Sequence, residues 1–106
     1  MREHKSAASP DGKLVARAFF ADSGAVGSHD QLVLLTPPDF VYKNDTEIQS
    51  FRVASMERVA DQNIELIWSG PKILTIRFTQ YGSGGYIDYR STYHGVEILI
   101  EHIRTK

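Results

Sequence analysis

Hydrophobic and polar residues alternate with a period of two along most of the chain. This is the pattern of β-strands with one buried face. Six segments show this alternation or a short apolar run of strand length: 13–20, 31–36, 63–69, 73–79, 86–93 and 96–103. They are rich in the β-branched and aromatic residues that sheets favour. The pattern therefore predicts an all-β protein.

Turn-forming residues separate these segments. Residues 9–12 read Ser-Pro-Asp-Gly, a type I turn before the first strand. Residues 69–72 form a loop of hairpin length, and His94-Gly95 is suited to a two-residue hairpin turn. Because short connections join antiparallel neighbours, the C-terminal half is predicted to be a meander of four strands.

Residues 46–61 allow two interpretations. A strand over about 50–55, followed by a short helical turn near 55–61, is favoured. The alternative is a helix, because four apolar residues fall loosely on one helical stripe. These are Ile48, Phe51, Met56 and Val59.

The predicted architecture is a single domain, 1–106, with residues 1–8 flexible. We expect a mainly antiparallel sheet of six to eight strands, curled into a sandwich or a partly open barrel. An exposed edge strand at 13–20 or 96–103 would allow a neighbouring chain to add a strand and would favour a homo-oligomer. The residues predicted to form the core are Phe20, Leu34, Leu66, Trp68, Ile76, Phe78, Ile98 and Ile100.

Composition removes several classes of function. Twelve Lys and Arg against 13 Asp and Glu give a formal charge of −1, which argues against a nucleic-acid binder. The chain has no cysteine, so it has no disulfides, no Cys-based zinc site and no thiol nucleophile. No apolar run approaches the roughly 20 residues that span a bilayer. With no leader visible, a cytoplasmic location is expected, or a periplasmic or envelope-attached one if a leader has been removed.

The segment 22–30 is the best enzymatic candidate. Asp22, Ser23, His29 and Asp30 are the ingredients of nucleophilic or metal-assisted hydrolysis. Neighbouring residues on an extended segment point to opposite sides, however, so a polar loop with Asp and Gly serving turn chemistry is favoured. The four histidines show no metal-ligand spacing, and neither a metal nor a cofactor is predicted.

Tyrosines gather in the C-terminal half, at Tyr81, Tyr86, Tyr89 and Tyr93. Tyrosine offers a large contact area and a polar tip, which suits protein interfaces. Arg90 could add an ion-pairing anchor. The alternative is that one face of this strand packs in the core and the other is ordinary surface.

In order, several motifs of this chain resemble those of an uncharacterised family of short bacterial proteins, many of which carry a lipoprotein or secretory leader. The motifs are Ser-Pro-Asp-Gly-Lys at 9–13, Asp-Ser-Gly-Ala at 22–25, the Trp68 hairpin and Gly-Val-Glu-Ile at 95–98. The family has a cysteine where this chain has Ser23, and two threonines where it has Val26-Gly27. The resemblance implies an envelope context and no catalytic residues.

These observations favour a non-enzymatic module that binds another protein. One version is an immunity protein that occludes a toxin encoded nearby, since such proteins need only a complementary surface. The predicted partner-binding residues are Asp22, Ser23, His29, Asp30, Tyr81, Tyr86, Tyr89, Arg90 and Tyr93. Two alternatives stay open: a small hydrolase or metal-dependent enzyme using the 22–30 loop, and an accessory envelope domain that pairs through an edge strand.

Overall fold

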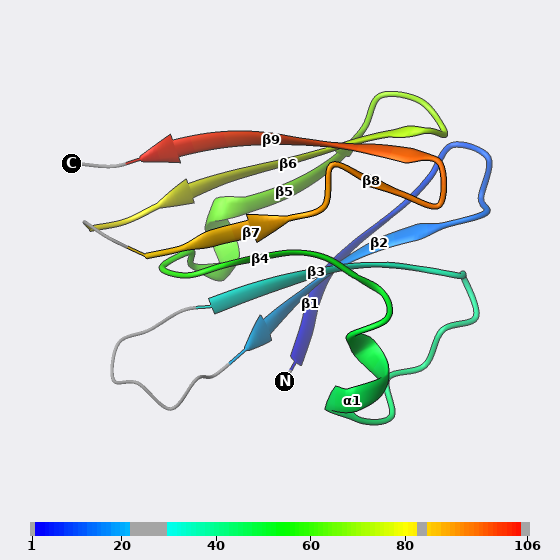
Figure 1. The fold of residues 1–106 in the computed structure, drawn as a ribbon, viewed down its shortest axis with the longest axis horizontal. Helices are drawn as coiled ribbons and strands as arrows, with labels where there is room; N and C mark the ends of the chain where they lie inside the picture. Colours follow the sequence, from blue (N-terminus) through cyan, green and yellow to red (C-terminus); the bar gives the residue numbers. More distant parts are fainter. Residues whose placement is uncertain (1, 22–29, 83–84, 105–106) are drawn as a thin grey trace.

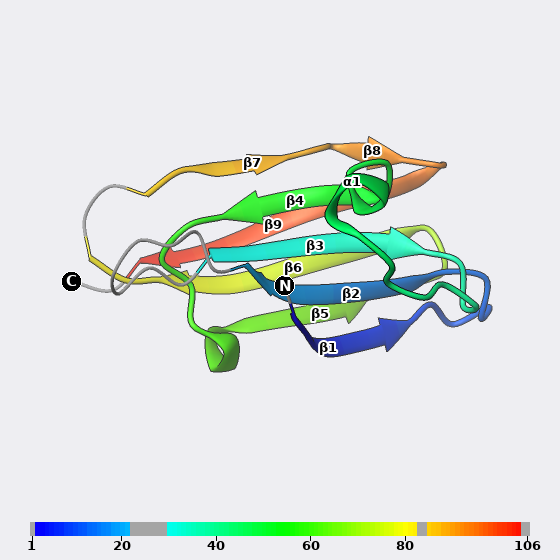
Figure 2. The same ribbon diagram turned by 90° about the horizontal axis from the view of Figure 1, so that it is seen from below.

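Two β-sheets packed face to face make up most of the computed structural model, which describes residues 2–21, 30–82 and 85–104 (Figures 1 and 2). The first sheet has the order β1-β2-β3-β4-β7, and the second has the order β5-β6-β9-β8. The first sheet comprises β1 (Arg2–Ala8), β2 (Val15–Ala21), β3 (Asp30–Thr36), β4 (Arg52–Met56) and β7 (Ile87–Tyr89). The second comprises β5 (Ile64–Trp68), β6 (Ile73–Gln80), β9 (Val96–Arg104) and β8 (Thr92–Tyr93). The all-β prediction is confirmed, and of the two predicted arrangements the sandwich fits.

The main core lies between the two sheets and follows the predicted alternation. On β6, Leu74, Ile76 and Phe78 are buried while the residues between them are partly exposed. Ile98 of β9 is also buried, and Leu66, Trp68 and Ile100 pack against this core from less buried positions. Phe20 is only half-buried, and the Arg2 guanidinium lies 5.2 Å from the centre of its ring.

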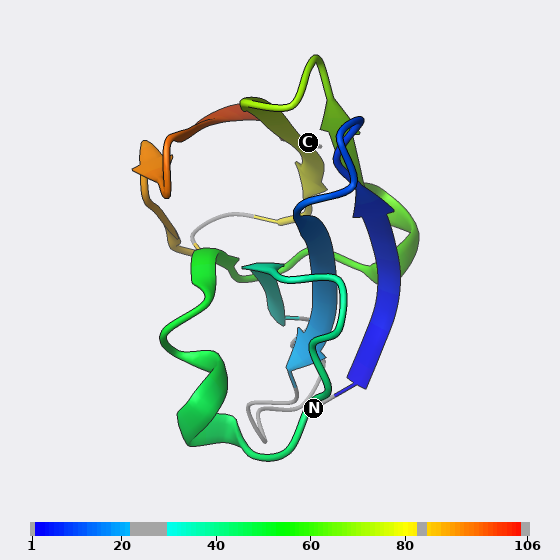
Figure 3. The same cartoon turned by 90° about the vertical axis from the view of Figure 1, so that its right-hand side faces the viewer.

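A second, smaller core covers the outer face of the first sheet. Phe19, Leu34 and Ile48 are its buried members. The chain between β3 and β4 lies over them, outside the layer that contains β3 (Figure 3). That segment includes α1 (Asp45–Ile48), whose N-cap Asn44 accepts a hydrogen bond from the Glu47 amide at 2.8 Å. This cover explains why β3 is apolar on both faces.

The predicted turns are present. The Gly12 amide donates to the Ser9 carbonyl at 2.9 Å, and Gly12 has a φ of 73°. His94 and Gly95 join β8 to β9 with φ values of 50° and 79°, as a type I′ hairpin turn requires. No helix within the described ranges is long and apolar enough to cross a bilayer.

The predicted C-terminal meander is wrong. β6 and β9 are parallel neighbours, with Ile76 opposite Ile100. The strand predicted over 86–93 is divided: β7 pairs with β4 of the first sheet, whereas β8 pairs with β9 of the second. Parallel neighbours need a long crossover connection. Here the chain between β6 and β9 contributes β7 to the first sheet and then returns to the second sheet as β8.

Three further expectations need correction. Residues 2–8, part of the segment expected to be flexible, form the strand β1, which is antiparallel to β2. The segment 13–20 does not lie at an edge, since β2 has β1 and β3 on its two sides. The segment 96–103 lies at an edge in part, because β8 pairs only with Val96 and Glu97 of β9, whereas β6 pairs with β9 from Glu97 to Arg104. The predicted strand near 50–55 is β4, but the helical turn after it is a 3₁₀ turn, η1 (Asp61–Asn63), later than expected. The described chain has nine strands, against the six to eight predicted, because β1 was not predicted and the 86–93 segment forms two strands.

We predict that Ile76→Asp prevents folding or lowers the free energy of unfolding by several kcal/mol, because it buries an unpaired charge. Ile76 is fully buried between the sheets. Its neighbour Thr75 points to the outer face of the same strand, so Thr75→Asp is the matched control and should fold. Urea denaturation followed by circular dichroism measures both. Equal stability of the two variants would contradict the assignment of faces.

Candidate functional site

β7 is the outermost strand on one side of the first sheet (Figure 2). Its inner side is bonded to β4: the Glu57 amide donates to the Tyr86 carbonyl at 3.0 Å, and the Arg90 amide donates to the Val53 carbonyl at 2.8 Å. Backbone groups of successive residues in an antiparallel strand point to opposite sides. The N–H and C=O groups of Ile87 and Tyr89 are therefore directed away from β4, toward the side without a neighbouring strand in the described chain. We call residues 86–90 the β7 edge.

Two large, exposed aromatic side chains lie on the β7 edge. The exposed fraction is 54% for Tyr86 and 48% for Tyr89. The Tyr86 hydroxyl lies 3.4 Å from the Ser55 hydroxyl, so this ring leans over β4. Glu57 also accepts a hydrogen bond from the Tyr86 amide at 2.9 Å, which fixes the start of the β7 edge.

A small concavity of about 120 Å³ lies at the other end of the β7 edge. Two arginines contribute to its wall. Arg90 donates through Nε to the Arg52 carbonyl at 3.1 Å, and Arg52 donates to the Ser55 hydroxyl at 3.2 Å. The Arg52 guanidinium also lies 3.8 Å from the carboxylate of Asp88. The concavity is lined by Arg52, Val53, Ala54, Asp88, Tyr89 and Arg90.

Tyr93 follows on β8 and serves the structure as well as the surface. Its hydroxyl donates to the Ser50 carbonyl at 2.5 Å, which ties the edge of the second sheet to the chain before β4. Burial raises the pKa of Tyr93, and the charge of Arg90 only partly opposes this rise. The Arg90 guanidinium lies 5.9 Å from the centre of the Tyr93 ring.

The structure thus brings together four of the predicted partner-binding residues, Tyr86, Tyr89, Arg90 and Tyr93. Tyr81 is in the connection after β6, where its amide donates to the Arg58 carbonyl at 3.0 Å. Asp30 begins β3, two strands away from β7. Asp22, Ser23 and His29 lie outside the described residues, so the hydrolytic interpretation of the 22–30 loop stays a prediction.

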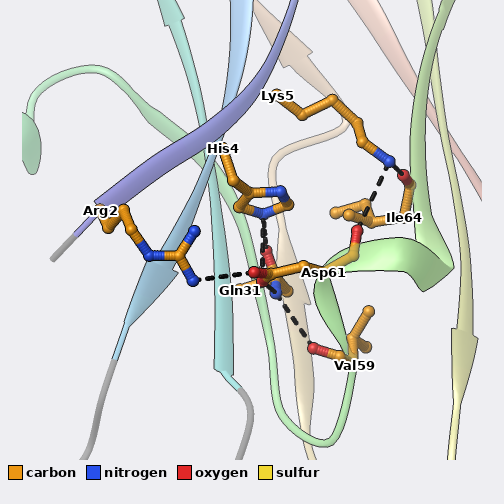
Figure 4. Close-up of polar contacts among 7 residues, drawn as sticks. All are labelled: Arg2, His4, Lys5, Gln31, Val59, Asp61 and Ile64. Atoms are coloured by element: carbon orange, nitrogen blue, oxygen red, sulfur yellow. Dashed lines mark hydrogen bonds and ion pairs between the residues drawn. The ribbon is translucent and has the colours of Figure 1, made fainter.

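A polar cluster that the sequence did not reveal joins β1 to η1 (Figure 4). Nε2 of His4 lies 2.7 Å from Oε1 of Gln31 and 3.5 Å from Oδ1 of Asp61. Gln31, which is fully buried, donates to the same Asp61 oxygen at 2.9 Å and to the Val59 carbonyl at 3.1 Å. Arg2 donates to the other Asp61 oxygen at 2.8 Å.

This cluster has the geometry of a structural clasp. The His4 side chain is only 8% exposed, and its Nε2 is already engaged by Gln31. The ring therefore presents little to a substrate, although histidine and aspartate are neighbours here. His4 was predicted to lie in a flexible terminus, because residues 2–5 are charged or polar and show no apolar alternation that would predict β1. Within the described residues, no group of three or more His, Asp or Glu could hold a metal ion.

Comparison with protein-family models, with curated proteins and with solved structures found no match for this chain. The family resemblance drawn from its motifs therefore stays a prediction. The functional argument depends on the geometry of the β7 edge.

We predict that Asp61→Asn lowers the free energy of unfolding by about 1 kcal/mol at neutral pH, because charge-assisted bonds in the clasp are lost. Burial alone would raise the pKa of Asp61, but the hydrogen bonds from Arg2 and Gln31 outweigh it and hold this pKa below its ordinary value of 3.8. The charged clasp is therefore present above pH 3.8 and lost as the pH falls below it.

Urea denaturation at pH 7 and at about pH 2 measures this difference. The stabilities of the wild type and Asp61→Asn should converge at the lower pH. Asp88→Asn is the control, since its carboxylate is 64% exposed and only loosely paired. A difference between wild type and Asp61→Asn that is the same at both pH values would contradict the assigned role.

Proposed function

We propose that this chain is a non-enzymatic binding module that takes up an extended segment of another protein as an added strand along β7. The observation that carries the proposal is that the backbone N–H and C=O groups of Ile87 and Tyr89 are directed outward at a sheet edge. Two exposed tyrosines, Tyr86 and Tyr89, lie on the same edge. Main-chain hydrogen bonds give such complexes affinity, and alternate side chains give them specificity.

The tyrosines suit this role because each provides a rigid, amphipathic contact surface at low cost in conformational entropy. Tyr86 leans over the outer face of β4, whereas Tyr89 stands next to the concavity. Because successive strand residues face opposite sides, their rings could contact both faces of an added strand. A sheet edge without such side chains would offer backbone bonds alone.

Three of the other sheet edges, those of β1, β5 and β8, are less suited to strand addition. On the opposite side of the sandwich, β1 and β5 lie near each other and are linked by side chains. Trp68 of β5 donates to the Ala7 carbonyl at 2.9 Å, and Lys5 of β1 donates to the Ile64 carbonyl at 2.5 Å. β8 has only two residues, and its Tyr93 is bonded to Ser50.

This proposal keeps the protein-binding interpretation of the sequence and moves its centre to the β7 edge. An immunity protein that occludes a toxin is one form that such a module can take, since occlusion needs only a complementary surface. The enzymatic alternative depends on His29, which the structure does not describe.

We predict that Tyr89→Pro weakens peptide binding roughly tenfold more than Tyr89→Ala, because it also removes the outward N–H. Proline is tolerated on an edge strand where its nitrogen faces solvent, so the bonds to β4 should survive. The ligand is a peptide selected from a displayed random library against the wild-type protein. Fluorescence anisotropy gives its Kd for the three proteins, and circular dichroism checks their folding.

Amide hydrogen exchange provides the second measurement. The selected peptide should slow exchange at Ile87 and Tyr89 in the wild type. Strand addition at the β7 edge is wrong if Tyr89→Pro and Tyr89→Ala bind the peptide equally well and if the peptide leaves the Ile87 and Tyr89 amides of the wild type unprotected.

A further inference from the structure

The outer face of the β7 edge presents a row of three different side chains. Tyr86, Asp88 and Arg90 are two residues apart, so they fall on the same face of the strand. Asp88 is opposite Ser55 of β4, and the hydroxyl of Tyr86 also lies near Ser55. Directly opposed residues of an added strand would stand about 4.5–5.5 Å from this row, close enough for their charges to interact.

Arg90 is the cation of this row. Its Nε donates to a backbone carbonyl, that of Arg52, and its guanidinium lies near the Tyr93 ring. In the described part of the chain no carboxylate forms an ion pair with Arg90, which is exposed. The concavity of about 120 Å³ beside it exceeds the roughly 30 Å³ that one water molecule occupies, which leaves room for a carboxylate group.

Asp88 is the anion of this row, and it retains capacity for a second cation. Its carboxylate is 64% exposed and lies 3.8 Å from one nitrogen of Arg52. The other terminal nitrogen of Arg52 donates to Ser55. A carboxylate has two oxygens and about four acceptor positions, so a basic side chain of an added strand can also bind it.

The same row disfavours a second copy of this chain as the added strand. Two copies could pair in an antiparallel register that uses the outward backbone groups of both Ile87 and Tyr89. In this register Ile87 of one copy lies opposite Tyr89 of the other. Asp88 then stands directly opposite Asp88 of the other copy. Like charges in this position destabilise strand pairing, and charged edge strands are a common protection against self-association.

We propose that the β7 edge selects a partner segment by charge: an acidic side chain faces Arg90 and a basic side chain, two residues later, faces Asp88. This inference rests on the proposed strand addition, in antiparallel orientation. Opposite charges across neighbouring strands stabilise the pairing, and an unmatched partner leaves Arg90 or Asp88 facing a like charge.

Three synthetic peptides test the inference. The first has the sequence Thr-Val-Glu-Val-Lys-Val-Thr, acetylated and amidated at its ends. The second carries Glu at both charged positions, and the third carries Lys at both. Isothermal titration gives the Kd of each peptide for the wild type and for Arg90→Glu, and amide exchange follows Ile87 and Tyr89.

The Glu/Lys peptide should bind the wild type at least fivefold more tightly than either of the other two. For Arg90→Glu the Lys/Lys peptide should become the tightest of the three. Equal affinities of the three peptides, with Ile87 and Tyr89 protected in every complex, would overturn the charge selection and leave strand addition intact. If none of the peptides protects these amides, strand addition itself fails.

Discussion

The parallel pairing of β6 with β9 is the constraint on which the rest of this structure depends. Two parallel neighbours cannot be joined by a hairpin, so the chain between them must leave the sheet and return. Here it returns to the second sheet between Arg90 and Ser91. The Arg90 amide donates to the Val53 carbonyl of the first sheet, and the Ser91 carbonyl accepts from the Ile98 amide of the second. Because this crossing must pass the side of the sandwich, a short strand is left at the edge of the first sheet. The β7 edge is thus a consequence of the topology.

The two sides of the sandwich are closed by different means. On the β1 side, separate strands are held by side chains: Trp68 bonds to the backbone of β1, and the clasp around Asp61 fixes β1 to η1. On the β7 side, the covalent chain itself runs from one sheet to the other, supported by Tyr93. Side chains on the first side are therefore used in packing, whereas Tyr86 and Tyr89 remain exposed on the second.

Local features of this fold could be predicted from the sequence, and non-local pairings could not. The Ser9–Gly12 turn, the His94-Gly95 hairpin and the alternating burial of β6 depend on residues close in sequence. A period of two says which side chains share a face, but it does not say which strand lies next to which. The 86–93 segment therefore looked like one strand, although its halves belong to different sheets. β1 was missed because Arg2, His4 and Lys5 face charged or polar partners, and no apolar pattern marks the strand.

The candidate site shows the same division. The tyrosines and Arg90 were predicted as contact residues from their type, but the outward direction of the backbone groups between them follows from the pairing of β7 with β4. This pairing also decides which charge stands next to which. Asp88 and Arg90 are separated by Tyr89, so a strand that bonds to Tyr89 has both charges beside it. A sheet edge that repels its own copy and offers opposite charges to another strand gains protection from self-association and selectivity from the same two residues.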